Sequence, residues 1–372
     1  MNQACFSHHD YGDDSSERDF AIVSAKRAAA ITAPQPSDVT EAAIRLRGTH
    51  VRKIILVHGT FTGNDVIGLA RELARVSPGL AKSIQSNGKS WVDQVAGDVG
   101  NYTQAFAKQL STLINTGQPT TIEVDRFNWS GENTHLGRAE GAVALLHTLM
   151  QQEWSPGSRV QIWGHSHGGN LIAMASQLIR ANADLLRSFF SATRSHHRGL
   201  PQWEQVQSVL IESEAGSRFP KLDAVTFGTP LRYRWNTDVT ETLTHFVQHR
   251  VLDDDDACTA RLPASAQDVI DAVGGDYIQQ LGIAGTDFLP SIFAPRTWLP
   301  ERRLSKMFAA GIRRRDLRKN LKQGQRVSQD GTTLLVDYPD CQHGWNRKLF
   351  GHGVYTRQEW IPFHLNAVMH GY

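Results

Sequence analysis

The stretch RVQIWGHSHGGNLIAMASQLI, residues 159–179, decides how this chain folds. Its first five residues form an apolar run of strand length, and its last ten carry apolar side chains at helical spacing. Between them stands Ser166, with Gly164 two places before it and Gly168 two places after it. A strand, Gly-x-Ser-x-Gly and then a helix predict a tight turn with the serine at its tip.

The glycines explain why such a turn is feasible. A side chain at Gly164 or Gly168 would collide with the neighbouring strand or helix, and Gly169 lets the helix begin close to the sheet. The helix N-terminus then directs partial positive charge toward Ser166 and toward any oxyanion formed there. We therefore predict that Ser166 is an activated nucleophile. An ordinary strand–helix connection is the alternative interpretation.

The rest of the chain supports an α/β fold from Val51 onward. Apolar runs of strand length alternate with helix-period segments such as YTQAFAKQLSTLI and RAEGAVALLHTLMQQ; the runs are KIILVHG, TIEVDRFNW, RVQIWGH, DAVTFGTP, THFVQHRVL and TTLLVDYP. Continuous apolar strands separated by helices predict a mostly parallel central sheet with helices on both faces.

The predicted organisation has two parts and one insertion. Residues 1–48 are polar and irregular, which predicts an N-terminal extension, with one short helix around residues 21–30. Residues 49–372 form the α/β domain. Residues 264–330 are longer than an ordinary connection and have helical character, so we expect a cap or lid there.

Composition excludes several classes of protein. The chain has 372 residues and a formal net charge of +2, which gives no reason to expect nucleic acid as a partner. Three cysteines are too few for a disulfide scaffold and indicate reduced thiols. The first twenty residues lack a secretory pattern and no apolar run is long enough to span a bilayer. We expect a cytoplasmic protein, although export without such a signal stays open.

A second motif, ILVHGTF, ends near residue 61, about a hundred residues before the serine. Acyl transfer needs two backbone N–H groups directed at the developing oxyanion. One normally comes from the residue after the nucleophile, here His167. The other comes from a glycine-containing loop after an earlier strand, which predicts Thr60 or Phe61, and we favour Phe61.

The order strand–HGTF, strand–GHSHGG–helix and strand–FGTP resembles the α/β-hydrolase superfamily. It is most similar to the bacterial lipase and esterase branch, including the class 3 lipases. The resemblance covers residues 51–263 and 331–372. It implies an α/β-hydrolase fold with a catalytic serine, acid and histidine in that chain order, each at the C-terminal end of a strand.

Within that order the acid and the base have several candidates. Asp253–Asp256 follow the strand THFVQHRVL, and we favour Asp254, with Asp253 next. His343 and His352 follow the last strand. We favour His352, because a general base must reach the serine from a loop and His352 stands between glycines just before the final helix.

These residues predict a serine hydrolase that cleaves carboxylic esters through an acyl-enzyme, without cofactor or metal. The resemblance implies lipid or similarly apolar ester substrates. The insertion 264–330 combines apolar residues with a basic run, so it is a candidate for contact with a membrane surface, or a cap with a solvated basic face. Thioesterase, amidase or acyltransferase chemistry on the same triad stays open, as does an inactive fold that binds a lipid or protein.

Overall fold

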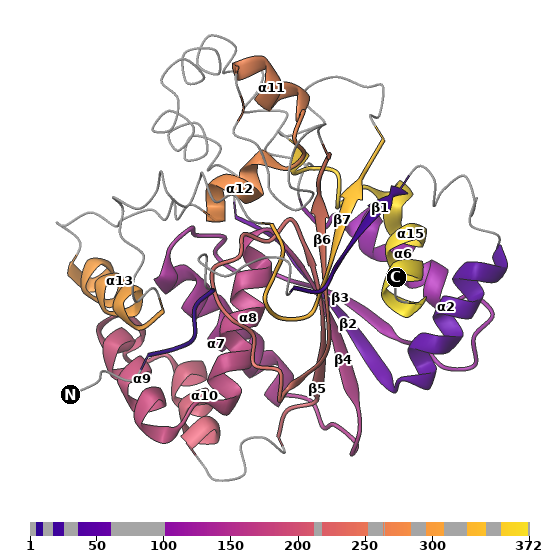
Figure 1. Ribbon diagram of the computed structural model, residues 1–372. Helices are drawn as coiled ribbons and strands as arrows, with labels where there is room; N and C mark the ends of the chain where they lie inside the picture. Colours follow the sequence, from indigo (N-terminus) through magenta and orange to yellow (C-terminus); the bar gives the residue numbers. More distant parts are fainter. Residues whose placement is uncertain are drawn as a thin grey trace.

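The structure is a computed structural model, and Figure 1 shows the arrangement of its elements. It describes residues 5–9, 18–25, 36–60, 101–211, 218–251, 263, 265–283, 295–308, 326–339 and 351–370.

A seven-stranded sheet with the order β1-β7-β6-β5-β4-β2-β3 forms the centre of the molecule, and every paired strand is parallel to its neighbour. The strands are β1 (Phe20–Ser24), β2 (Val51–Val57), β3 (Glu123–Phe127), β4 (Arg159–His165), β5 (Lys221–Phe227), β6 (Thr240–Gln248) and β7 (Thr332–Asp337). Because all of them run in one direction, their carboxyl ends meet at a single edge of the sheet.

Helices cover both faces of this sheet (Figure 1). One face carries α7 (His135–Met150), α8 (His167–Arg180), α9 (Ala183–His197), α10 (Pro201–Ile211) and α13 (Pro295–Phe308). The other carries α2 (Pro36–Gly48), α6 (Gln104–Asn115) and α15 (Ile361–His370), the last preceded by a short 3₁₀ turn at Gln358–Trp360. The predicted α/β class and the parallel sheet are confirmed.

The apolar strands supply two cores at once because successive side chains point to opposite faces. In β2, Ile55 and Val57 belong to the core under α7 and α8, whereas Ile54 and Leu56 belong to the core under α2 and α6. All four are at most 2% exposed. This double burial explains why the strands read as continuous apolar runs.

The first 48 residues differ from the predicted extension. Phe20–Ser24 forms β1, an edge strand paired with β7, in the region where a helix was expected. α2 packs against α15 and α6 in the second core. Phe6 is buried and stacks on Phe308 of α13. The segment is polar on average, so its composition did not indicate that a few of its apolar residues belong to the core of the domain.

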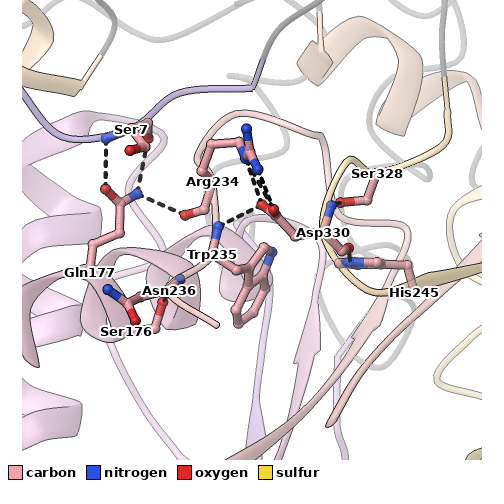
Figure 2. Close-up of polar contacts among 9 residues, drawn as sticks. All are labelled: Ser7, Ser176, Gln177, Arg234, Trp235, Asn236, His245, Ser328 and Asp330. Carbon is pink, nitrogen blue, oxygen red and sulfur yellow. Dashed lines mark hydrogen bonds and ion pairs between the residues drawn. The ribbon is translucent and has the colours of Figure 1, made fainter. Parts of the chain in front are cut away.

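Backbone and amide hydrogen bonds fix the N-terminal segment in place (Figure 2). The Gln177 side chain of α8 accepts from the Ser7 N–H and donates to the Ser7 carbonyl, at 2.8 and 3.0 Å. The same amide donates to the Arg234 carbonyl. Arg234 in turn forms a bidentate pair with Asp330, which lies just before β7. The N-terminus, α8 and the connections to β6 and β7 are therefore one polar network.

The predicted insertion contains three described helices, α11 (Ala266–Asp271), α12 (Tyr277–Ile283) and α13. α12 lies at the carboxyl edge of the sheet (Figure 1), where Gly282 packs closely on Pro230. α13 packs against α9 and α7. The apolar residues Phe288–Phe293 and the basic run beyond residue 308 lie outside the described residues. None of the described helices is long and apolar enough to span a membrane.

Candidate active site

Ser166 occupies a strained turn between β4 and α8. Its φ and ψ are 52° and −132°, and α8 begins at the next residue, His167. A positive φ is uncommon for a residue with a side chain, and such strain persists only where the surroundings enforce it. The Ser166 N–H donates to the Phe227 carbonyl at the end of β5, which fixes the turn to the sheet edge.

Close packing explains the three glycines of the turn. A Cβ on Gly164 would lie 2.7 Å from the Gly169 nitrogen, and a Cβ on Gly168 would lie 2.6 Å from the His58 carbonyl oxygen. On Gly169 it would overlap the Thr229 side chain. The predicted collisions are therefore present, and only glycine lets strand and helix approach this closely.

The end of β2 lies directly beside the serine. A Cβ on Gly59 would come within 2.7 Å of the Ser166 Cβ. Trp129 fixes this segment from the side, because its indole N–H donates to the His58 carbonyl at 2.8 Å. Thr60 is described and buried, whereas Phe61, the favoured second oxyanion donor, lies outside the described residues. The loop predicted to face the nucleophile is in the expected place up to Thr60.

The structure pairs His352 with a carboxylate that the sequence did not indicate. His352 Nδ1 lies 2.7 Å from Oδ2 of Asp276, in the segment between β6 and α12. The favoured acid was Asp254. That residue lies outside the described residues with the whole run Asp253–Asp256, and so does His343. Among the described residues, Asp276 is the carboxylate paired with His352.

This pairing sets which ring nitrogen of His352 is the donor. An ionised carboxylate only accepts hydrogen bonds, so Nδ1 is the donor of this pair and Nε2 is the ring nitrogen left over. Nε2 is buried and has no hydrogen-bond partner in the described part of the chain. A neutral imidazole with a free Nε2 is the form that a general base requires.

Three further groups surround the Asp276 carboxylate, which is fully buried. The Tyr355 hydroxyl donates to Oδ2 at 2.8 Å, and the Gln279 N–H at the start of α12 donates to Oδ1 at 2.8 Å. Burial alone would raise the pKa of Asp276, but His352, the Gln279 N–H and the charge of Arg326 together hold that pKa below its ordinary value. Asp276 is therefore an anion under ordinary conditions.

His165 connects the serine turn to this pair. Its ring lies 4.6 Å from the His352 ring between centroids, and its Nε2 is 3.2 Å from the His352 carbonyl oxygen. Burial, reinforced by the nearby His352, lowers the pKa of His165 to about 3. The neutral His165 ring donates to the His352 carbonyl, and this hydrogen bond holds His352 beside the serine turn, because His165 directly precedes Ser166.

On the other side of the serine, His167 faces a buried polar cluster. Its Nδ1 lies 3.4 Å from Nη1 of Arg138 and 3.2 Å from the Asn170 amide. The Arg138 guanidinium also donates to Asn133 and Tyr233. Asn133, in the segment between β3 and α7, contributes to this cluster by accepting a hydrogen bond from Arg138 at 3.0 Å.

The described site therefore contains a strained serine, a His–Asp pair and the backbone N–H of His167 at a helix N-terminus. Ser166, His167 and His352 were predicted from the sequence as site residues, whereas Asp276 was not. The sequence signal for Asp276 was weak: it follows the pair Gly274–Gly275, which indicates a turn, and directly precedes a helix. Among the described residues, no three histidine, cysteine, aspartate or glutamate side chains are grouped as a metal ion would require.

Comparisons with known proteins add no relative to this picture. No protein-family model, no curated protein and no solved structure matches the chain.

Proposed function

We propose that this chain is a serine hydrolase of the α/β-hydrolase type that cleaves carboxylic esters through an acyl-enzyme. The observation that carries the proposal is the positive φ of Ser166, at a strand–helix turn that shares a sheet edge with the His352–Asp276 pair. Strained residues of this kind occur where a function needs them. The parallel sheet and the placement of serine, acid and histidine after β4, β6 and β7 agree with the proposed fold family.

The proposed reaction uses each group in a defined role. His352 Nε2 takes the proton of the Ser166 hydroxyl while the serine oxygen attacks the ester carbonyl. Asp276 stabilises the resulting imidazolium through Nδ1. The His167 N–H and a donor from the loop after Gly59 stabilise the oxyanion. His352 then protonates the leaving alcohol. In the second half of the reaction His352 takes a proton from water, which attacks the acyl-enzyme, and returns a proton to Ser166 as the carboxylic acid leaves.

The same triad would also serve a thioesterase, an amidase or an acyltransferase. Ester hydrolysis is favoured over amide hydrolysis because an alcohol is an easier leaving group than an amine. An inactive fold that binds a partner is told apart by the fluorophosphonate probe below, which labels only an activated serine.

The proposed substrates are apolar esters, and α13 supplies the candidate contact with a lipid surface. Its solvent-exposed side is basic and apolar: Arg296, Leu299, Arg302, Arg303 and Lys306. The Arg302 guanidinium lies over the Trp298 ring at 5.3 Å. Such a surface suits anionic head groups.

The protein should sediment with phosphatidylserine-containing vesicles, and the double variant Arg302→Glu/Arg303→Glu should stay in the supernatant. Equal retention by pure phosphatidylcholine vesicles would count against this contact.

A fluorophosphonate probe tests the proposed activity most directly. The probe should label Ser166, as found by peptide mass spectrometry, and p-nitrophenyl butyrate should be hydrolysed. Ser166→Ala should abolish labelling and lower kcat by at least about 10³-fold, because the nucleophile is gone while the fold remains.

The matched control is Ser191→Ala, which removes an exposed serine from α9. It should label and turn over like the wild-type protein. Hydrolysis that persists in Ser166→Ala, or a wild-type protein that the probe does not label, would overturn the proposal.

A further inference from the structure

Arg326 is a fully buried cation at the carboxyl edge of the sheet. Its Nη1 donates to the Gln248 carbonyl at the end of β6, at 2.5 Å. Nε and Nη2 have no hydrogen-bond partner in the described part of the chain. A buried charge with so few hydrogen bonds is costly unless an opposite charge lies near it. The buried anion that acts on Arg326 is Asp276.

Arg326 also packs against the turn that delivers Asp276. The Gln248 carbonyl that accepts from Arg326 accepts from the Asp276 N–H as well, at 3.0 Å. Between them, Gly275 has a φ of 101°, and a Cβ there would lie 2.7 Å from Arg326 Nη1 and 2.3 Å from the Gln248 oxygen. The guanidinium therefore occupies the space that a side chain at position 275 would need.

Titratable and polar groups from several elements act on the His352–Asp276 pair: His165 from β4, Gln279 from α12 and Tyr355 from the C-terminal segment. His58 acts on His165, and Tyr277 of α12 lies near Arg326. Burial raises the pKa of Tyr355 well above its ordinary value, so this group stays neutral, and burial likewise lowers the pKa of His165 and His58. Arg326, in contrast to these groups, is a permanent cation, and its charge acts on Asp276.

We propose that Arg326 is a positioning residue of the triad, whose hydrogen bond to the Gln248 carbonyl fixes the turn before Asp276 and whose charge adds to the groups that favour the anionic carboxylate. This inference rests on the proposed hydrolase function and extends it. Arg326 acts through Asp276 and contacts neither the substrate nor Ser166. Without its charge, the His352–Asp276 pair binds a proton more readily, so the base becomes available only at higher pH.

The test is the pH profile of kcat/KM for p-nitrophenyl butyrate, measured on the full chain. In Arg326→Met the midpoint of the acidic limb should rise, by up to about one pH unit, because the charge of Arg326 favours the ionised form of Asp276. kcat should fall and KM should stay near its wild-type value. Arg326→Lys keeps the charge without the planar fork, and its midpoint should stay at the wild-type pH.

Arg326→Gln separates charge from hydrogen bonding and serves as the second neutral variant if Arg326→Met does not fold. It retains a donor for the Gln248 carbonyl but no charge, so its midpoint should rise like that of Arg326→Met. A neutral variant that loses thermal stability and activity together, with an unchanged midpoint, would show a merely structural role and overturn the inference.

Failure of the two proposals can be told apart. If the wild-type protein is labelled at Ser166 and active, but both neutral variants keep the wild-type midpoint, the role of Arg326 alone is refuted. If the wild-type protein is neither labelled nor active, both proposals fall together.

Discussion

The turn between β4 and α8 and the turn between α11 and α12 place Ser166 and Asp276 at the same edge of the sheet but are built in opposite ways. The first is local, since Gly164, Ser166 and Gly168 lie within five consecutive residues of one strand–helix junction. The second is assembled from distant parts of the chain. Asp276 is held by β6, by α12, by Arg326 and by Tyr355 from the C-terminal segment.

This difference shows where each turn is vulnerable. A local turn is disrupted by a substitution within it, because one methyl group added to a glycine of the turn displaces the helix. An assembled turn is weakened through its partner residues, because the substitution of one partner removes one hydrogen bond or charge and leaves the others in place. The two turns should therefore respond differently to substitution, with large and abrupt losses in the first and graded losses in the second.

Substitution of the acid itself should have the largest effect. Asp276→Asn should lower kcat about 10⁴-fold, because an amide cannot hold His352 in the tautomer that leaves Nε2 free. Steady-state kinetics with p-nitrophenyl butyrate measures this loss. Asp254→Asn is the control, and it should retain wild-type activity. The reverse result, with Asp254→Asn inactive and Asp276→Asn active, would return the acid to the run Asp253–Asp256.

The local turn should break next. Gly168→Ala places a methyl group about 2.6 Å from the His58 carbonyl oxygen, so α8 must move away from β2. We expect kcat to fall about 10²-fold through misplacement of the His167 N–H, and the free energy of unfolding to fall by about 1–3 kcal/mol. Kinetics and urea denaturation measure the two effects.

The matched control for that variant is Gly48→Ala at the end of α2. A Cβ at Gly48 meets nothing within 4 Å, so activity and stability should change little. If Gly168→Ala behaves like Gly48→Ala, the close approach of α8 to β2 is not what positions the serine.

Loss of one partner of Asp276 should be milder. Tyr355→Phe removes the hydroxyl that donates to Asp276 and accepts from the Gln248 N–H. A hydrogen bond to a charged group contributes about 1.5 kcal/mol, so kcat should fall about tenfold with KM unchanged. A loss as large as that of Asp276→Asn would mean that this turn depends on one residue and does not respond in a graded way.

The smallest effect concerns stability alone and comes from a buried histidine away from the reacting groups. Burial lowers the pKa of His364 to about 3, and its ring accepts a hydrogen bond from Tyr338. Below the ordinary histidine pKa of about 6.5, the unfolded chain binds a proton that the folded chain refuses. The stability that His364 contributes is therefore lost as the pH falls below that value, amounting to about 2 kcal/mol at pH 5.

His364→Gln removes this titration. The difference in free energy of unfolding between pH 7 and pH 5, measured by urea denaturation, should shrink by about 2 kcal/mol relative to the wild-type protein. The buried His165 and His245 titrate in both proteins and so cancel in the comparison. An unchanged difference would show that His364 is not the group responsible.

Much of the fold and half of the site could be predicted because their signals lie in neighbouring residues. Continuous apolar runs predict the parallel sheet, and three glycines around Ser166 predict the tight strand–helix turn. His352 could be chosen from its place before the final helix. Asp276 could not, because its selection depends on the Gln248 carbonyl, the Gln279 N–H and Tyr355, which meet only in the folded chain.

The same reasoning explains the misjudged N-terminus. β1 is a five-residue strand within a polar segment, and its burial depends on the pairing with β7. Phe6 is a single apolar residue whose place in the core depends on Phe308 of α13. Neither signal repeats within its own segment, so periodicity could not detect it.

The pairing of β1 with β7 also sets the order in which the molecule can be completed during synthesis. Asp19 contacts Thr332 across 313 residues of sequence, so β1 leaves the ribosome long before the strand that it pairs with. Strands β2 to β6 can assemble as they emerge, but β1 must wait until β7 has been translated. A nascent chain stalled before residue 332 therefore contains the Ser166 turn but leaves β1 without its neighbour, and a protease should remove β1 more readily from it than from the released protein.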